Sequence, residues 1–130
     1  MSGMRVLISG EIDVAPGVRD QTLRDAKPFI AAALAERGCA HYAWTADPEL
    51  PGRIHVFEEW ETAEDLAAHL VGQPYFNMAG HLTAAGILSA VTRKYRVDHT
   101  EPVYGPDGVA TAEFLTARSA LQTASAKDRT

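Results

Sequence analysis

The sequence contains a single cysteine, Cys39, so no disulfide bond can form within the chain. A lone cysteine favours a reducing compartment, because small secreted domains commonly rely on several disulfides. No run of residues approaches the roughly 20 apolar residues that a transmembrane helix needs. The opening of the chain holds only a three-residue apolar run, 6–8, which is too short for a signal peptide. We therefore expect a cytoplasmic protein with no membrane partner.

Positive charge is also scarce. The chain has 12 lysines and arginines against 17 acidic residues, which gives a formal net charge of −5. Proteins that bind nucleic acids present a basic stripe or patch to the phosphates, and no such stripe is visible. Nucleic acid is therefore excluded as the expected partner.

Sequence motifs for metals and large cofactors are missing as well. The five histidines are scattered, with no helical His-x₃-His pair and no cysteine pair, the spacings that protein metal sites commonly use. There is no glycine-rich phosphate loop and no dinucleotide fingerprint. We therefore expect no metal and no bound cofactor.

What the chain does contain fits one folded domain. It has 130 residues, 46% of them hydrophobic and 22% charged, which is typical of a single globular domain. Large apolar residues become few near the end, and the last six residues, SAKDRT, are polar. We predict a domain at residues 1–104 and a partly disordered C-terminal arm at 105–130, with a short arm or helix near 110–122.

Periodicity along the chain predicts four strands and intervening helices. Alternation with period two predicts strands at 4–14, 39–46, 53–60 and 88–98. Helical spacing of apolar residues predicts helices at about 19–36, 63–70 and 74–85. Pro28 should kink the first helix or divide it into two. This βαββαβ order is that of an α+β, ferredoxin-like fold, a four-stranded antiparallel sheet of order 4-1-3-2 with helices on one face.

The face of the sheet without helices carries apolar residues of its own. Leu7 alternates with Ile8, Phe57 with Val56, and Tyr42 with Ala43, so neither face is purely polar. An exposed apolar sheet face usually marks an interface. We therefore expect a homodimer in which the sheets of two copies face each other.

Several short motifs resemble the antibiotic biosynthesis monooxygenase family of dimeric α+β barrels. They are Gly-Cys at 38–39 followed by Tyr42, Glu-x-Trp at 58–60, Ala-His at 68–69, Pro-x-Phe at 74–76, and the stretches VAPGVRD and TRKYRV. The resemblance covers roughly residues 4–103. It implies the dimeric α+β barrel fold, and relatives that include quinol-type monooxygenases without cofactors, heme-degrading oxygenases and isomerases of small signalling molecules.

Three residues are candidates for a small-molecule site. Glu58 and Trp60 point the same way from one strand, and His69 falls at the border of the apolar stripe on the following helix. Each also has a structural explanation, namely a hydrogen-bonded core carboxylate, ordinary core packing, and a surface histidine. Further candidates for binding a substrate are the aromatic residues and the second helical histidine, Tyr42, Tyr75, Phe76 and His81.

The first hypothesis is a cofactor-independent monooxygenase that oxidises a hydroxylated aromatic compound or quinol with dioxygen. His69 would be the catalytic base, because histidine has the appropriate unperturbed pKa. Glu58 would orient it or donate a proton, and Trp60 would stack on the substrate. The alternatives are a non-catalytic dimer that binds a small molecule and a heme-degrading oxygenase. The resemblance implies an asparagine on the first strand for heme degradation, and VLISGEIDV contains none.

Overall fold

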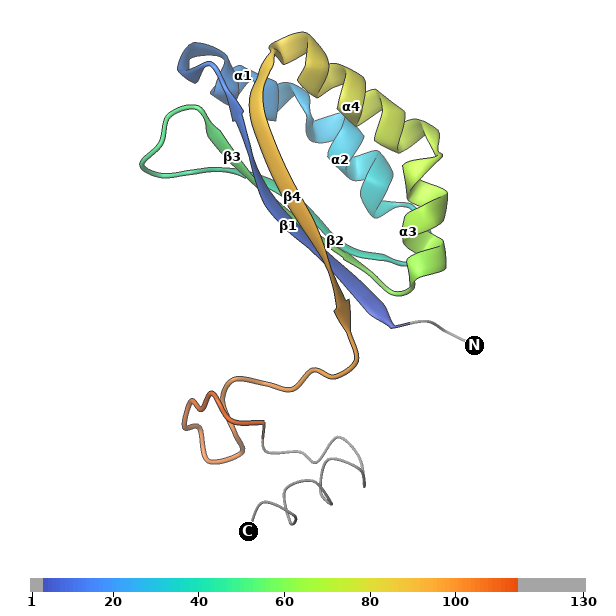
Figure 1. Ribbon diagram of the computed structural model, residues 1–130, viewed down its shortest axis with the longest axis vertical. Helices are drawn as coiled ribbons and strands as arrows, with labels where there is room; N and C mark the ends of the chain where they lie inside the picture. The colour runs from blue at the N-terminus through green and yellow to red at the C-terminus, as the bar shows by residue number, and fades with distance from the viewer. Residues whose placement is uncertain (1–3, 115–130) are drawn as a thin grey trace. The chain divides into compact units, whose positions relative to one another are not determined.

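The computed structural model describes residues 4–114 and consists of four strands and four helices in that range. The strands are β1 (Arg5–Val14), β2 (Cys39–Ala46), β3 (Arg53–Trp60) and β4 (Ile87–Val97). The helices are α1 (Pro16–Asp25), α2 (Lys27–Leu34), α3 (Ala63–Leu70) and α4 (Gln73–Ala85). All strand pairs are antiparallel, in the order β2-β3-β1-β4, as Figure 1 shows. The predicted ferredoxin-like fold and strand order are confirmed.

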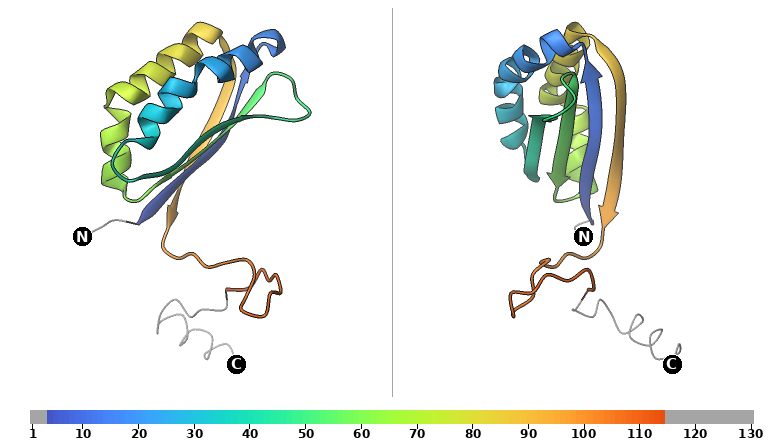
Figure 2. Two further views of the ribbon diagram at one scale, coloured as in Figure 1. Left: turned by 180° about the vertical axis from the view of Figure 1, so that it is seen from behind. Right: turned by 90° about the vertical axis from the view of Figure 1, so that its left-hand side faces the viewer.

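The helices form one layer over one face of the sheet, and Figure 2 shows the other face uncovered. Pro28 divides the first helical region into two helices, which meet at Ala26. Proline is tolerated in the first turn of α2 because the N–H that it lacks would have no partner there. The sequence predicted either a kink at Pro28 or a division into two helices, and the structure has two helices.

The core lies between the sheet and the helices. Val6, Ile12 and Ile54 point to the helical side and are at most 7% exposed, and Trp60 on β3 is fully buried. Their polar neighbours along the strands alternate to the other face, as the period of two requires. This alternation was correctly predicted.

The inward face of α3 differs from the prediction. Leu66 and His69 are its buried residues, whereas Leu70, expected to point inward, is 42% exposed. His69 is 1% exposed, so its predicted position at the border of the stripe is wrong. Residues three apart on a helix share a face. The helix α3 is rotated so that the face with Leu66 and His69 points toward the core.

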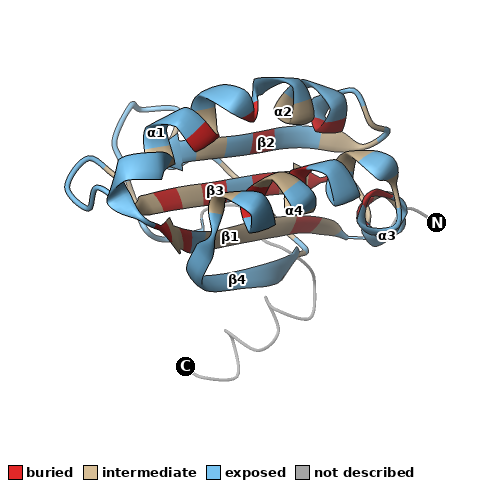
Figure 3. Cartoon of the chain, turned by 90° about the horizontal axis from the view of Figure 1, so that it is seen from above, coloured by how far each residue is buried: buried red, intermediate tan, exposed pale blue. Residues whose placement is uncertain are grey.

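The strand β4 forms one edge of the sheet and is the least covered element. Every residue from Ile87 to Arg96 is exposed. Figure 3, which looks at the molecule from the side of the helices, shows no buried position on this strand. On the helix-free face, Phe57, Val91 and Tyr95 are 40–49% exposed. That face also carries ion pairs, Arg5 with Glu59 and Arg53 with Asp13, so it is mixed rather than purely apolar.

The chain divides into two units, 1–97 and 98–130. In the described part of the second unit, Tyr104 and Ala110 pair in an antiparallel bridge around a turn in which Gly108 has a positive φ. The chain at 110–114 is not helical. The rest of the arm expected near 110–122, and the polar end, lie outside the described residues.

Candidate functional site

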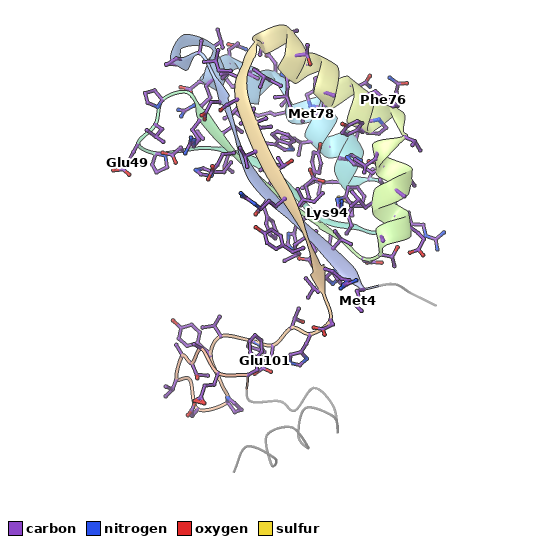
Figure 4. All side chains as sticks on the ribbon, in the orientation of Figure 1. Met4, Glu49, Phe76, Met78, Lys94 and Glu101 are labelled. Atoms are coloured by element: carbon purple, nitrogen blue, oxygen red, sulfur yellow. The ribbon has the colours of Figure 1, made fainter. Side chains whose placement is uncertain are left out.

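A pocket of about 320 Å³ lies between the sheet and the helices α3 and α4. All four strands contribute to its floor and sides, and the two helices close it from the other side. Met78 of α4 points into the layer between helix and sheet, and it is labelled in Figure 4. The lining of the pocket is mostly apolar and aromatic. It comprises Ile8, Ile12, Tyr42, Trp44, Val56, Glu58, His69, Leu70, Tyr75, Met78, Ala79, Leu82, Thr83, Ile87, Ala90 and Thr92.

His69 reaches this pocket because of how α3 begins. Thr62 caps the helix, with its side-chain oxygen accepting a hydrogen bond from the Asp65 N–H over 3.0 Å, as the predicted capping motif requires. Two turns later, His69 points at the sheet. Its ring lies 4.6 Å from the Trp60 ring and 5.6 Å from the ring of Tyr42, centroid to centroid. The imidazole is thus held among aromatic rings, away from bulk solvent.

The partner of His69 is Glu36, in the turn that follows α2. His69 Nδ1 lies 2.6 Å from Glu36 Oε1. A carboxylate accepts hydrogen bonds, so Nδ1 carries the proton and donates it to Glu36. In the tautomer that donates from Nδ1, the lone pair of the ring lies on Nε2. Glu58 is predicted to orient the histidine or to donate a proton, and the carboxylate that contacts the His69 ring nitrogen is that of Glu36.

Glu58 is a buried carboxyl group in the pocket wall, 8% exposed. Trp60 Nε1–H donates a hydrogen bond of 2.9 Å to Glu58 Oε1. Burial raises the pKa of Glu58 above its usual value, and the Trp60 hydrogen bond and the nearby His69 offset this only in part. Glu58 therefore holds its proton to higher pH than a surface glutamate does.

Tyr42 and Tyr75 also line the pocket, as expected. The ring of Tyr75 lies 5.6 Å from the His69 ring in an edge-on arrangement. Burial raises the pKa of Tyr42 far above its usual value, so the phenol keeps its proton at neutral pH. These two rings and His69 form a continuous aromatic wall.

Three predicted site residues lie outside the pocket lining. Trp60 is fully buried behind it, against the His69 ring, so it supports the site and does not form its surface. Phe76 is 53% exposed on the other side of α4. His81 Nε2 lies 2.8 Å from the Thr22 carbonyl oxygen and its ring contacts Phe29. His81 therefore ties α4 to the α1–α2 region.

The prediction missed two residues of the site. Glu36 is 33 positions before His69 in the sequence, and nothing in the local pattern links them. Trp44 could have been found, because it alternates with Tyr42 on β2 and therefore shares its face. Glu36 adds a carboxylate beside the pocket and Trp44 an indole ring in its wall.

Other chemistry has little support among residues 4–114. No three histidine, cysteine, aspartate or glutamate side chains in that range gather closely enough to hold a metal ion. Burial raises the pKa of the Cys39 thiol to about 11, so it stays protonated and is a poor nucleophile at neutral pH. None of the helices in the described range has the length and apolar character to cross a membrane.

The sequence matches the model of one protein family, described as antibiotic biosynthesis monooxygenase, over residues 5–79. No curated protein sequence matches the chain.

Solved structures share the fold at low sequence identity. A Deinococcus radiodurans protein, provisionally named an antibiotic biosynthesis monooxygenase, is 17% identical with a TM-score of 0.69, and the match covers 77% of this chain and 99% of that one. A conserved protein from Methanosarcina mazei is 20% identical, with a TM-score of 0.65 and coverage of 72% and 92%. A Pseudomonas aeruginosa protein is 22% identical, with a TM-score of 0.62 and coverage of 75% and 96%.

Proposed function

The chain belongs to the antibiotic biosynthesis monooxygenase family, and we propose that it oxidises a small hydroxylated aromatic compound or quinol with dioxygen, without a bound cofactor. The family supports a general monooxygenase or small-molecule-binding role. The observation that carries the finer proposal is the buried His69, which opens on an aromatic pocket while Glu36 holds its other nitrogen. The volume of about 320 Å³ lies at the small end of ligand pockets.

In this proposal His69 is the catalytic base. Its Nε2 accepts the proton of a substrate hydroxyl, and the Glu36 carboxylate stabilises the imidazolium that forms. The same hydrogen bond fixes the ring orientation before the substrate binds, which lowers the entropic cost of reaching the reactive geometry. Glu36 is therefore a positioning residue, because it acts through the histidine.

The deprotonated substrate supplies the electrons. An electron-rich phenolate reduces dioxygen, and a carbon–oxygen bond forms at a ring carbon that bears hydrogen. The O–O bond then breaks, so that the ring carbon becomes a carbonyl carbon and the second oxygen leaves as water. Hydroxyarene and dioxygen thus give quinone and water, with atoms and electrons balanced. Glu58, whose pKa burial raises, donates the proton to the departing oxygen.

A homodimer through the helix-free face belongs to the same proposal. The exposed β4 and the apolar residues of that face, Phe57, Val91 and Tyr95, would be covered by a second copy. A cytoplasmic location and a domain boundary near residue 104 also stay predictions.

Replacing His69 by asparagine tests the catalytic role. The asparagine amide lies at the position of Nδ1 and can still donate to Glu36, but no base remains at Nε2. Turnover of 1,4-dihydroxynaphthalene under air should fall on the order of 10²–10⁴-fold, with oxygen uptake as the measurement. Because His69 is buried, asparagine is the milder variant.

His81→Ala is the matched control, a helical histidine outside the pocket, and should keep turnover within a few-fold. Near-normal turnover of a folded His69→Asn protein would remove His69 from the catalytic role. If the unmodified protein binds the diol and is stabilised by it without consuming oxygen, the chain is a non-catalytic binder.

A further inference from the structure

A second hollow lies at the edge of the sheet, between residues 63–70 of α3, the start of β1 and residues 94–96 of β4. We call it the edge groove. Its volume is about 680 Å³. Among the described residues, Leu70 is the one that lines both the edge groove and the pocket at His69. The edge groove is therefore a neighbouring site with walls of its own.

The walls of the edge groove are apolar. The helix α3 contributes Ala63, Ala67 and Leu70, which are spaced four and three residues apart and so share one side of the helix. The sheet contributes Val6, and Met4, which Figure 4 labels, precedes β1. Leu70 and Met4 are 42% and 48% exposed. Large apolar side chains exposed together around a hollow commonly mark a binding surface.

The hollow stays open because nothing fills the space above the end of β4. The helix α3 packs on β1 and β3, and every residue of β4 from Ile87 to Arg96 is exposed. On the side of α3 that lines the groove, Ala63 and Ala67 are exposed and carry a single methyl group each. Small side chains here leave room for a ligand beside the helix.

Two cationic side chains stand at the rim of the edge groove, those of Lys94 and Arg96. The sheet register pairs Lys94 with Ile8 and Arg96 with Val6, and residues directly opposite each other on antiparallel strands share a face. Val6 and Ile8 pack in the core under the helices, so both cations lie on the helical side. Residues two apart on a strand are separated by about 7 Å, so two side chains of this length can reach one anionic group.

These two cations have no carboxylate of their own. No acidic residue lines the edge groove, and β4 contains none. Within residues 4–114, neither Lys94 nor Arg96 forms an ion pair, whereas four other arginines do, namely Arg5, Arg19, Arg37 and Arg53. In a chain of net charge −5, unpaired positive charge beside an apolar groove is complementary to a ligand with an apolar body and an anionic end.

We propose that the edge groove binds a free single-chain carboxylate, such as the anion of a medium-chain fatty acid. The alkyl chain lies against Leu66, Leu70 and Val6, and the carboxylate meets Lys94 and Arg96. A guanidinium holds a carboxylate through two parallel hydrogen bonds, and a lysine adds a point charge. This site goes beyond the proposed function, because it requires no turnover at His69.

The charge of the edge groove favours a free ligand over a membrane surface. Segments that bind anionic membranes commonly gather four to eight basic residues, and the rim of this groove has two. The concave shape also suits one chain better than a lipid headgroup layer. Vesicles of phosphatidylglycerol are therefore part of the test.

Calorimetry with octanoate, decanoate and 1-octanol, each below its micelle or solubility limit, separates the two parts of the site. Decanoate should bind the unmodified protein roughly four- to tenfold more tightly than octanoate, because each buried methylene contributes up to about fourfold. The double variant Lys94→Gln, Arg96→Gln should weaken octanoate binding roughly five- to tenfold and leave 1-octanol unchanged. Arg93→Gln is the matched control, because Arg93 lies on the same strand opposite Ser9, on the other face.

A pair of substitutions on α3 tests the location independently of the cations. Ala67→Glu places a negative charge in the edge groove and should abolish decanoate binding. Ala68→Glu makes the same change at the next position, which is also exposed but lies outside the groove, and should leave binding within about twofold. In ¹³C methyl spectra, decanoate should shift the Ala67 signal and leave that of Ala79, which lines the pocket at His69, in place.

Several results would overturn this site. They are no binding of decanoate, equal losses in Arg93→Gln and the double variant, equal effects of Ala67→Glu and Ala68→Glu, and a shift of the Ala79 methyl signal without one at Ala67. Binding to phosphatidylglycerol vesicles without binding of monomeric decanoate would replace the free ligand by a membrane surface, and would also refute the proposal. Turnover of 1,4-dihydroxynaphthalene is a separate measurement that none of these results decides.

Discussion

Glu58 is a buried carboxyl group whose protonation affects stability. Burial raises its pKa in the folded state above the value in the unfolded chain, so the folded protein binds its proton more tightly. The contribution of this group to stability is therefore fully present below the unfolded pKa and is lost as pH rises through the folded pKa. The site keeps an acid in an apolar wall at the expense of stability near neutral pH.

Glu58→Gln should reveal this cost. Glutamine is neutral at every pH and its oxygen can still accept the Trp60 hydrogen bond. The free energy of unfolding of Glu58→Gln, minus that of the unmodified protein, should therefore increase as pH rises from about 4 to about 7. Urea denaturation at several pH values measures it. Glu49→Gln, in the exposed 47–52 loop, gives the trend for a surface carboxylate. A difference that stays flat or falls after this correction contradicts the assignment.

Other residues at this scale act through shape. Trp60 fills the layer behind His69 and donates to Glu58, so it links the base and the acid without lining the pocket. Its role differs from the stacking platform that its spacing from Glu58 suggested.

At the scale of elements, the contact between β1 and β4 depends on Gly10. A side chain at this position would meet the carbonyl oxygen of Val91 and the Cα and methyl carbons of Thr92. Two of these three atoms belong to the backbone of β4, which cannot move without breaking the pairing. The absence of a side chain therefore permits the close approach of the edge strand.

Gly10→Ala should destabilise the fold by about 1–3 kcal/mol, the usual cost of inserting atoms into a packed region. Denaturant titration gives the value. Gly80→Ala is the matched control, since a side chain there meets no atom within 4 Å. This alanine lies within α4 and should stabilise the protein by roughly 0.5–1 kcal/mol. Equal effects of the two substitutions would contradict the close contact.

At the scale of the whole molecule, the uncovered sheet face is the surface through which we propose that two copies pair. A single layer of helices leaves one face of the sheet and all of β4 without cover, as Figures 2 and 3 show. Its exposed apolar residues lie among ion pairs. This mixture suits an interface with an apolar centre and a polar rim.

Phe57→Lys should convert the proposed dimer into a monomer. The lysine adds a charge to the apolar centre of the face, and an unpaired charge buried between two sheets is costly. Light scattering at micromolar concentration should give the mass of two chains for the unmodified protein and of one chain for the variant. Leu34→Lys is the control, because Leu34 is similarly exposed but lies on α2. A monomeric unmodified protein would refute the dimer outright.

The sequence by itself determined the elements and their arrangement. Period-two alternation placed Val6 and Ile12 on the buried face of β1, the residues Thr62 and Pro74 placed the starts of two helices, and Pro28 placed the break between α1 and α2. These features depend on a few neighbouring residues and on backbone geometry, so local patterns suffice to predict them.

The tertiary structure alone decided how the site is connected. The rotation of α3 about its axis buried His69 and exposed Leu70, and packing brought Glu36 to His69 from 33 residues away. A residue at the border of the apolar stripe of a helix can face the core or the solvent at a similar local cost in free energy. Only packing against the sheet beneath the helix selects one of the two orientations. Contacts between residues distant in sequence leave no periodic pattern, which is why His69 could be singled out from the sequence and its partner Glu36 could not.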